Sequence, residues 1–188
     1  MAVEGWCSVE DLVRWAFAHA PVVMANEAHN GLARCVRTRE VGVRMIQGPI
    51  LAIPPDREGY LTQPDMQRLI GAALDLGWTL WAYEAVIEVT PDTDQEHLRS
   101  MEFTNWRERE QAANLGRLLD AAPGEPLLVW CGNSHASKVE HEEWIPMGWH
   151  FRDMSGIDPF VIDQAPSLLA GWAGVEALVV STDNEMAA

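Results

Sequence analysis

The sequence has little positive charge. It holds 13 Lys+Arg against 28 Asp+Glu, a formal net charge of -15, and Lys138 is its single lysine. Such a chain repels phosphate backbones and anionic lipid headgroups, so we expect neither a nucleic acid nor a membrane as partner. It also lacks an apolar run near the roughly 20 residues of a membrane span. The first residues, MAVEGWCSVEDLVRW, lack the basic segment of a secretory signal. We therefore expect a cytoplasmic protein.

Cysteine and phenylalanine are also sparse. The three cysteines, Cys7, Cys35 and Cys131, are odd in number and never form a C-x-x-C pair. This pattern excludes a disulfide framework and a thiolate zinc knuckle, and it favours a reducing compartment. Nine tryptophans outnumber four phenylalanines, which suits an aromatic pocket for a bulky apolar substrate or the interface of a homodimer.

The 188 residues, 48% of them hydrophobic, are enough for a single domain with a sizeable core. No linker divides residues 1–188, and residues 182–188 are predicted to form a frayed tail. A hydroxyl residue followed three positions later by an acid begins three predicted helices, near 9–19, 63–76 and 94–121. A fourth helix is predicted from His29 to about Gln47.

Short apolar runs rich in β-forming residues lie between these helices, at 21–25, 78–85, 126–131, 160–162 and 177–180. The runs are continuous rather than alternating, as expected of strands covered on both faces. We predict a three-layer α/β sandwich with a mostly parallel sheet of about four to five strands. Three prolines and two glycines in Gly48–Gly59 predict a connecting loop.

Polar side chains follow three of the predicted strands. Glu27 and His29 end the first in the segment NEAHNG, Glu84 ends the second, and Asn133 and His135 follow the third in CGNSHA. Ligands of parallel sheets bind at the carboxyl ends of the strands, so these side chains should converge. The set suits a divalent metal such as Mn²⁺, Zn²⁺ or Fe²⁺ with a bound water, held by Glu27, His29, Glu84 and His135. Without metal, a histidine oriented by a carboxylate suits a general base.

Further residues near this edge are candidates for contacts with the substrate. Arg109, in WREREQAANL, lies one turn before two alanines, and its guanidinium would reach a substrate carboxylate or Glu84. The ordinary interpretation of such Arg-Glu alternation is a solvated helix face. Lys138 would contact an anionic substrate or, by default, solvent. Cys131 is interpreted as inert packing, and the segment 144–153 as a wall or lid of the substrate pocket.

Four of these motifs together resemble the erythromycin esterase, ChaN and Tiki superfamily. NEAHN is similar to its G-E-x-H-D element, WAYEA to its strand-end glutamate, CGNSHA to its G-x-x-H element, and REREQAANL to its R-D/E-x-x-x-A helix. The match runs in order from Val22 to Ala136. The resemblance implies a compact α/β fold with one pocket at the strand ends. Its members hydrolyse macrolide esters, cleave peptides with a divalent metal, or bind haem and iron.

By this resemblance the functional set is Glu27, His29, Glu84, Arg109 and His135, with Glu110 as a supporting acid. Asn26 replaces the glycine of the first motif, and Asn30 replaces the aspartate that follows its histidine, which removes a negative charge near the pocket. Haem binding of the ChaN kind would need a tyrosinate, and Tyr60 rather than Tyr83 is placed to supply it.

Our leading hypothesis is a hydrolase of an ester or amide bond in a small molecule or peptide, with water activated by metal or histidine and the anion stabilised by Arg109. Two alternatives stand beside it. The same site would also serve proton-transfer chemistry in an epimerase, lyase or cyclase. A non-catalytic haem- or iron-binding protein is the second.

Overall fold

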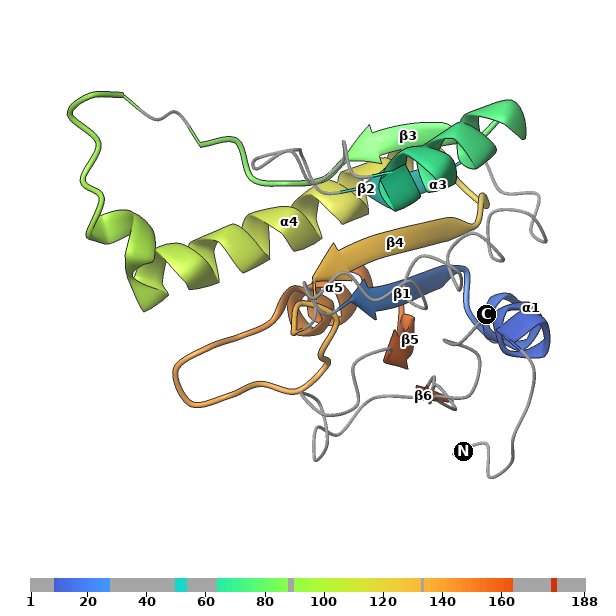
Figure 1. The fold of residues 1–188 in the computed structure, drawn as a ribbon. Coiled ribbons are helices and arrows are strands. Elements are labelled where there is room, and N and C mark those ends of the chain that lie inside the picture. The colour runs from blue at the N-terminus through green and yellow to red at the C-terminus, as the bar shows by residue number, and fades with distance from the viewer. Residues whose placement is uncertain are drawn as a thin grey trace, which may run out of the picture.

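A computed structural model describes residues 9–27, 50–53, 64–87, 90–132, 134–163 and 177–178. These residues contain one six-stranded sheet in the order β3-β2-β4-β1-β5-β6 (Figure 1). Its described strand pairs are all parallel, which confirms the predicted α/β fold, with six strands rather than four or five. The strands are β1 (Val22–Glu27), β2 (Ile50–Ile53), β3 (Thr79–Ala82), β4 (Leu127–Gly132), β5 (Phe160–Asp163) and β6 (Ala177–Leu178).

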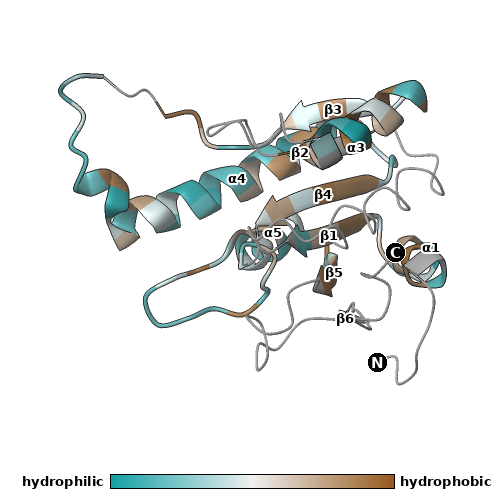
Figure 2. Cartoon of the chain, in the orientation of Figure 1, coloured by the Kyte–Doolittle hydropathy of each residue, from teal (hydrophilic) through white to brown (hydrophobic). Residues whose placement is uncertain are grey.

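Helices cover both faces of the sheet and make it the middle of three layers. Successive β1 residues face opposite sides, so Val23 joins one core cluster and Met24 the other. The Val23 cluster contains residues of α1 (Val9–His19) and α3 (Pro64–Asp75). The Met24 cluster contains residues of α4 (Met101–Ala121) and α5 (Met147–Ser155). In Figure 2 hydrophobic positions gather on the strands, whereas α4 is hydrophilic along much of its length.

The long helix α4 begins later than its sequence predicts. Thr93 does not cap a helix, because its Oγ1 accepts the amide of Thr90 in a turn. A short 3-10 helix, η2 (His97–Arg99), follows, and the side chain of Ser100 then accepts the Phe103 amide as the N-cap of α4. Towards its other end α4 buries Leu115 and Leu118 against the sheet. Burial of each leucine contributes roughly 1.5–3 kcal/mol.

One prediction about a loop is wrong. Residues 50–53 of the predicted loop Gly48–Gly59 form β2, which pairs with both β3 and β4. The predicted wall at 144–153 is largely α5, which packs on α4 and buries Met147 and Phe151. The predicted helix at 29–47 and the tail 182–188 lie outside the described residues.

The parallel arrangement brings the carboxyl ends of the strands to one edge of the sheet. The segments that follow β3 and β4 both extend from this edge, beyond the arrowheads in Figure 1. The amino-terminal half of α4 lies beside them and carries the buried polar residues Glu108 and Gln111. Among the described helices none is long and apolar enough to cross a bilayer.

Candidate active site

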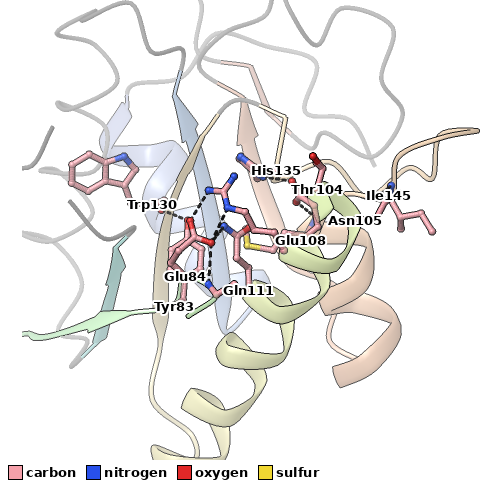
Figure 3. A network of polar contacts seen from close by, with 12 residues as sticks. Tyr83, Glu84, Thr104, Asn105, Glu108, Gln111, Trp130, His135 and Ile145 are labelled. Carbon is pink, nitrogen blue, oxygen red and sulfur yellow. Dashed lines mark hydrogen bonds and ion pairs between the residues drawn. The ribbon is translucent and has the colours of Figure 1, made fainter. Parts of the chain in front are cut away.

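The first feature of the carboxyl edge is an ion pair between Glu84, just after β3, and Arg107 of α4 (Figure 3). The guanidinium binds side-on, with Nε 2.9 Å from Oε1 and Nη2 2.5 Å from Oε2. Oε1 also accepts the Ala85 amide at 2.9 Å and Nε2 of Gln111 at 2.8 Å. Both carboxylate oxygens of Glu84 are therefore engaged by protein donors.

The charge state of this pair follows from its surroundings. Burial alone would raise the pKa of Glu84. The hydrogen bond and charge of Arg107, together with the hydrogen bonds from the Ala85 amide and the Gln111 side chain, hold that pKa below its ordinary value. Burial also opposes the charge of Arg107, and the carboxylate of Glu84 overcomes it, so the pKa of Arg107 is raised. Glu84 and Arg107 are therefore both ionised at neutral pH.

The backbone that carries Glu84 is fixed by two further side chains. Nδ2 of Asn114, on α4, donates to the carbonyl oxygens of Tyr83 at 3.0 Å and Glu84 at 3.1 Å. The buried hydroxyl of Tyr83 donates to the carbonyl oxygen of Trp130 on β4 at 2.9 Å. Burial raises the pKa of Tyr83 well above its ordinary value, which keeps the phenol neutral. These bonds connect β3, β4 and α4 around the site.

The second feature is a contact between His135, after β4, and Glu108 of α4. Nδ1 of His135 lies 2.5 Å from Oε1 of Glu108, and the side chains are 24% and 1% exposed. The contact is short but not aligned as an ideal hydrogen bond. Oε2 of Glu108 accepts the Met147 amide of α5 at 2.7 Å. The imidazole thus turns its buried Nδ1 to a carboxylate while part of the ring reaches solvent.

The two pairs influence each other electrostatically. Arg107 and Glu108 are consecutive, and the charge of Glu108 adds to that of Glu84 in raising the pKa of Arg107. Figure 3 shows Glu84, Glu108 and His135 within one polar network. A carboxylate-oriented histidine beside a fixed guanidinium is suited to moving a proton near a developing negative charge.

Only part of the predicted site lies within the described residues. Glu27 ends β1, where it pairs in register with Gly132, but its side chain is not described. Asn26 is fully buried on β1 beside Cys131. Outside the described residues lie His29, Asn30, Tyr60 and Asn133. The described structure therefore brings together Glu84 and His135, through α4, from the predicted set.

The predicted contact between Arg109 and Glu84 is wrong in register, because Glu84 binds Arg107, whereas Arg109 is exposed. Likewise, the acid beside His135 is Glu108, whereas Glu110 is only partly buried. The helix pattern of the superfamily that the sequence resembles favours the same register. Read from Arg107, the pattern R-D/E-x-x-x-A ends on Ala112, whereas read from Arg109 its last position is Asn114.

Of the four predicted metal ligands, Glu84 and His135 have described side chains. In the described part of the chain, no group of three or more His, Cys, Asp and Glu side chains is placed to hold a metal. Glu84 in particular accepts four hydrogen bonds and has become the partner of a guanidinium. Of the predicted ligands this leaves His135, together with Glu27 and His29, whose side chains are not described.

Lys138 and Cys131 are both buried in the interior of the protein. Lys138 is buried, and its Nζ donates to Oδ1 of Asp158 at 3.0 Å and to the carbonyl oxygen of Pro159 at 3.1 Å. The predicted solvent-exposed or substrate-facing lysine is therefore wrong. Cys131 is a fully buried residue of the core, consistent with its interpretation as packing.

Comparison with known proteins supports the fold. No family model matches the chain, and no curated protein sequence matches it significantly. Among solved structures it is similar to the type III effector HopBA1, with 13% identity and a TM-score of 0.52 over 86% of this chain and 83% of that one. It is also similar to RRSP, a MARTX toxin effector domain from Vibrio vulnificus, with 13% identity and a TM-score of 0.50 over 85% of this chain. The match covers only 36% of the RRSP chain. At this identity the likeness shows a shared α/β fold.

Proposed function

We propose that this protein is an enzyme of the hydrolase type, which cleaves an ester or amide bond at the carboxyl edge of its sheet. The observation that carries the proposal is the contact between Nδ1 of His135 and the buried carboxylate of Glu108. A carboxylate on Nδ1 fixes the imidazole tautomer in which Nε2 accepts a proton. That is the arrangement of a general base.

In the proposed reaction, Nε2 of His135 takes a proton from a water molecule while the water oxygen attacks the substrate carbonyl carbon. The carbonyl oxygen becomes an oxyanion, and the imidazolium then gives its proton to the leaving alcohol or amine as the carbon–oxygen or carbon–nitrogen bond breaks. Arg107 uses Nε and Nη2 for Glu84, so its Nη1 end remains to stabilise the oxyanion or to bind a substrate carboxylate. Glu84 positions Arg107 and does not touch the substrate.

The corrected helix register also supports the resemblance to the erythromycin esterase, ChaN and Tiki superfamily, which we retain as a proposal. Arg107, Glu108 and Ala112 fit its helix pattern better than Arg109, Glu110 and Asn114 do. Metal-ligating histidines also turn their second nitrogen to a carboxylate, so a metal-bound water is the second candidate. In that case His135 would be joined by Glu27 and His29, and the metal would lower the pKa of its water.

The test combines kinetics with elemental analysis of protein purified without chelator or affinity metal. Wild type, His135→Asn and the exposed control His97→Asn are assayed on panels of esters, amides and peptides. We expect hydrolysis in wild type and in the control, and a loss of about 10²–10⁴-fold in kcat for His135→Asn. Metal that leaves with His135 would assign the metal-bound water. A His135→Asn variant as active as wild type would rule out the proposed base.

A further inference from the structure

The turn that carries His135 and the first turn of α5 approach each other closely. Two consecutive amides of α5 point back at the proposed catalytic pair. The Met147 amide donates to Oε2 of Glu108 at 2.7 Å, and the Gly148 amide donates to the carbonyl oxygen of His135 at 2.8 Å. One amide thus holds the acid and the next holds the backbone of the base.

The N-terminus of α5 has no cap of its own. Its N-cap residue is Pro146, which makes no side-chain cap hydrogen bond. The first amides of a helix have no partner within it. The carboxylate of Glu108, on α4, accepts a hydrogen bond from one of these amides of α5, that of Met147. Asn105, one turn earlier on α4, bonds the carbonyl oxygen of Glu143 and the amide of Ile145. Helix α4 therefore fixes both the start of α5 and the segment that leads into it.

Gly148 allows this approach because it has no side chain. A Cβ at this position would lie 2.5 Å from the carbonyl oxygen of Ala136 and 2.8 Å from that of Ser137. These are backbone atoms, which cannot rotate aside as a flexible side chain would. The φ angle of Gly148 is not positive, so the requirement is for space and not for a left-handed conformation.

We propose that the N-terminus of α5 is the element that positions His135 against Glu108, and that Gly148 is the positioning residue that permits it. This inference deepens the proposed function and rests on it for its kinetic readout. Gly148 does not touch the substrate. A methyl group at position 148 pushes the 135–137 backbone away from α5 and moves Nδ1 of His135 off the carboxylate of Glu108.

The experiment compares Gly148→Ala with Gly116→Ala. Gly116 is a matched control, since it also lies within a helix, has no positive φ, and has open space where the Cβ would be. In wild type and in Gly116→Ala, ¹⁵N NMR of labelled histidines should find His135 as the Nδ1-protonated tautomer, assigned by His135→Asn. In Gly148→Ala we expect loss of that single tautomer and a fall in kcat of about 100-fold, with KM little changed. An unchanged His135 spectrum and kcat in Gly148→Ala would overturn the inference.

A second pair of variants decides the matter if Gly148→Ala does not fold. Met147→Pro and Met147→Ala both remove the buried methionine side chain, but only proline also removes the amide that donates to Glu108. Proline is tolerated at the first residue of a helix, and the extended conformation of Pro146 suits the residue before it. We expect the His135 tautomer to be lost only in Met147→Pro, and equal spectra for the two variants would overturn the inference.

The NMR readout separates this inference from the proposed function. The wild-type protein could hydrolyse no ester or amide while the NMR signals of His135 change in Gly148→Ala. That result would support the positioning role of Gly148 and contradict the proposed hydrolase function. Hydrolysis by wild type together with unchanged NMR signals of His135 in Gly148→Ala would support the hydrolase function and contradict the positioning role.

Discussion

Arg107 and Glu108 are consecutive residues of α4, yet they bind side chains that follow two different strands. Arg107 pairs with Glu84 after β3, and Glu108 contacts His135 after β4. In the sheet, β2 lies between these two strands. The rotation of about 100° between neighbouring helical positions sends the two side chains to separate strand ends. The phase of α4, more than the conformation of any loop, therefore sets the spacing of the two pairs.

Replacement of Glu108 by glutamine should lower both stability and activity. The side-chain oxygen of glutamine can still accept a hydrogen bond from His135, but its amino group then faces the Met147 amide, so two donors face each other in a buried position. We expect a loss of roughly 1–3 kcal/mol in the free energy of unfolding. Urea unfolding measures it, with Glu110→Gln as a control expected to stay within about 0.5 kcal/mol of wild type. Equal stability of the two variants would contradict the buried role of Glu108.

Removal of Arg107 should destabilise the fold far more than removal of Arg109. Glu84 has a side chain only 4% exposed, and without its 29% exposed partner it becomes a buried, unpaired charge. We expect Arg107→Ala to lose about 2–4 kcal/mol, below the full range for a buried pair because Arg107 is partly solvated. Arg107→Lys should recover only part of this, since lysine cannot form the two parallel bonds. Chemical unfolding should find Arg109→Ala close to wild type.

The stability of the protein should fall in acid through Glu84. The pKa of this carboxyl is lower in the folded chain than its ordinary value of 4.5. The ionised form therefore stabilises the fold above pH 4.5, and this contribution disappears as the pH falls through the lowered value. Glu84→Gln should be less stable than wild type at pH 7, and the difference should shrink below pH 4.5. Unfolding curves between pH 7 and pH 3 test this, and a constant difference over the whole range would refute it.

The single lysine should resist acylation in the native protein. Nζ of Lys138 is buried and bound to Asp158 and Pro159, with the lysine side chain 3% exposed and the aspartate 67% exposed. An amine-reactive ester should leave Lys138 unmodified until denaturant is added, as peptide mass spectrometry would record. Asp158→Asn should change this little, because the carbonyl of Pro159 and the burial persist. Rapid acylation of the native wild type would contradict the described burial.

Continuous apolar runs, alternating with predicted helices, were enough to predict the layers of this fold. The strand β2 was missed because proline and glycine flank the short run ILAI, and those residues are typical of loops. Its pairing with β3 and β4 is a long-range effect that local sequence does not encode. Strand-end positions predicted the edge near Glu84 and His135, since parallel strands share one carboxyl edge. The choice between Arg107 and Arg109 depended on the rotation of α4, which its alternating charges left undetermined.

The two halves of α4 have different tasks, and both belong to one rigid helix. Leu115 is packed in the core and Glu108 holds His135, about 10 Å apart along the helix axis. A cavity or an oversized side chain beneath Leu115 would tilt or shift the whole of α4 rather than a single turn. The rate of the proposed reaction would then respond to the volume of a core residue that does not touch the substrate. Variants selected for activity are therefore expected to include compensating changes in the apolar layer under α4.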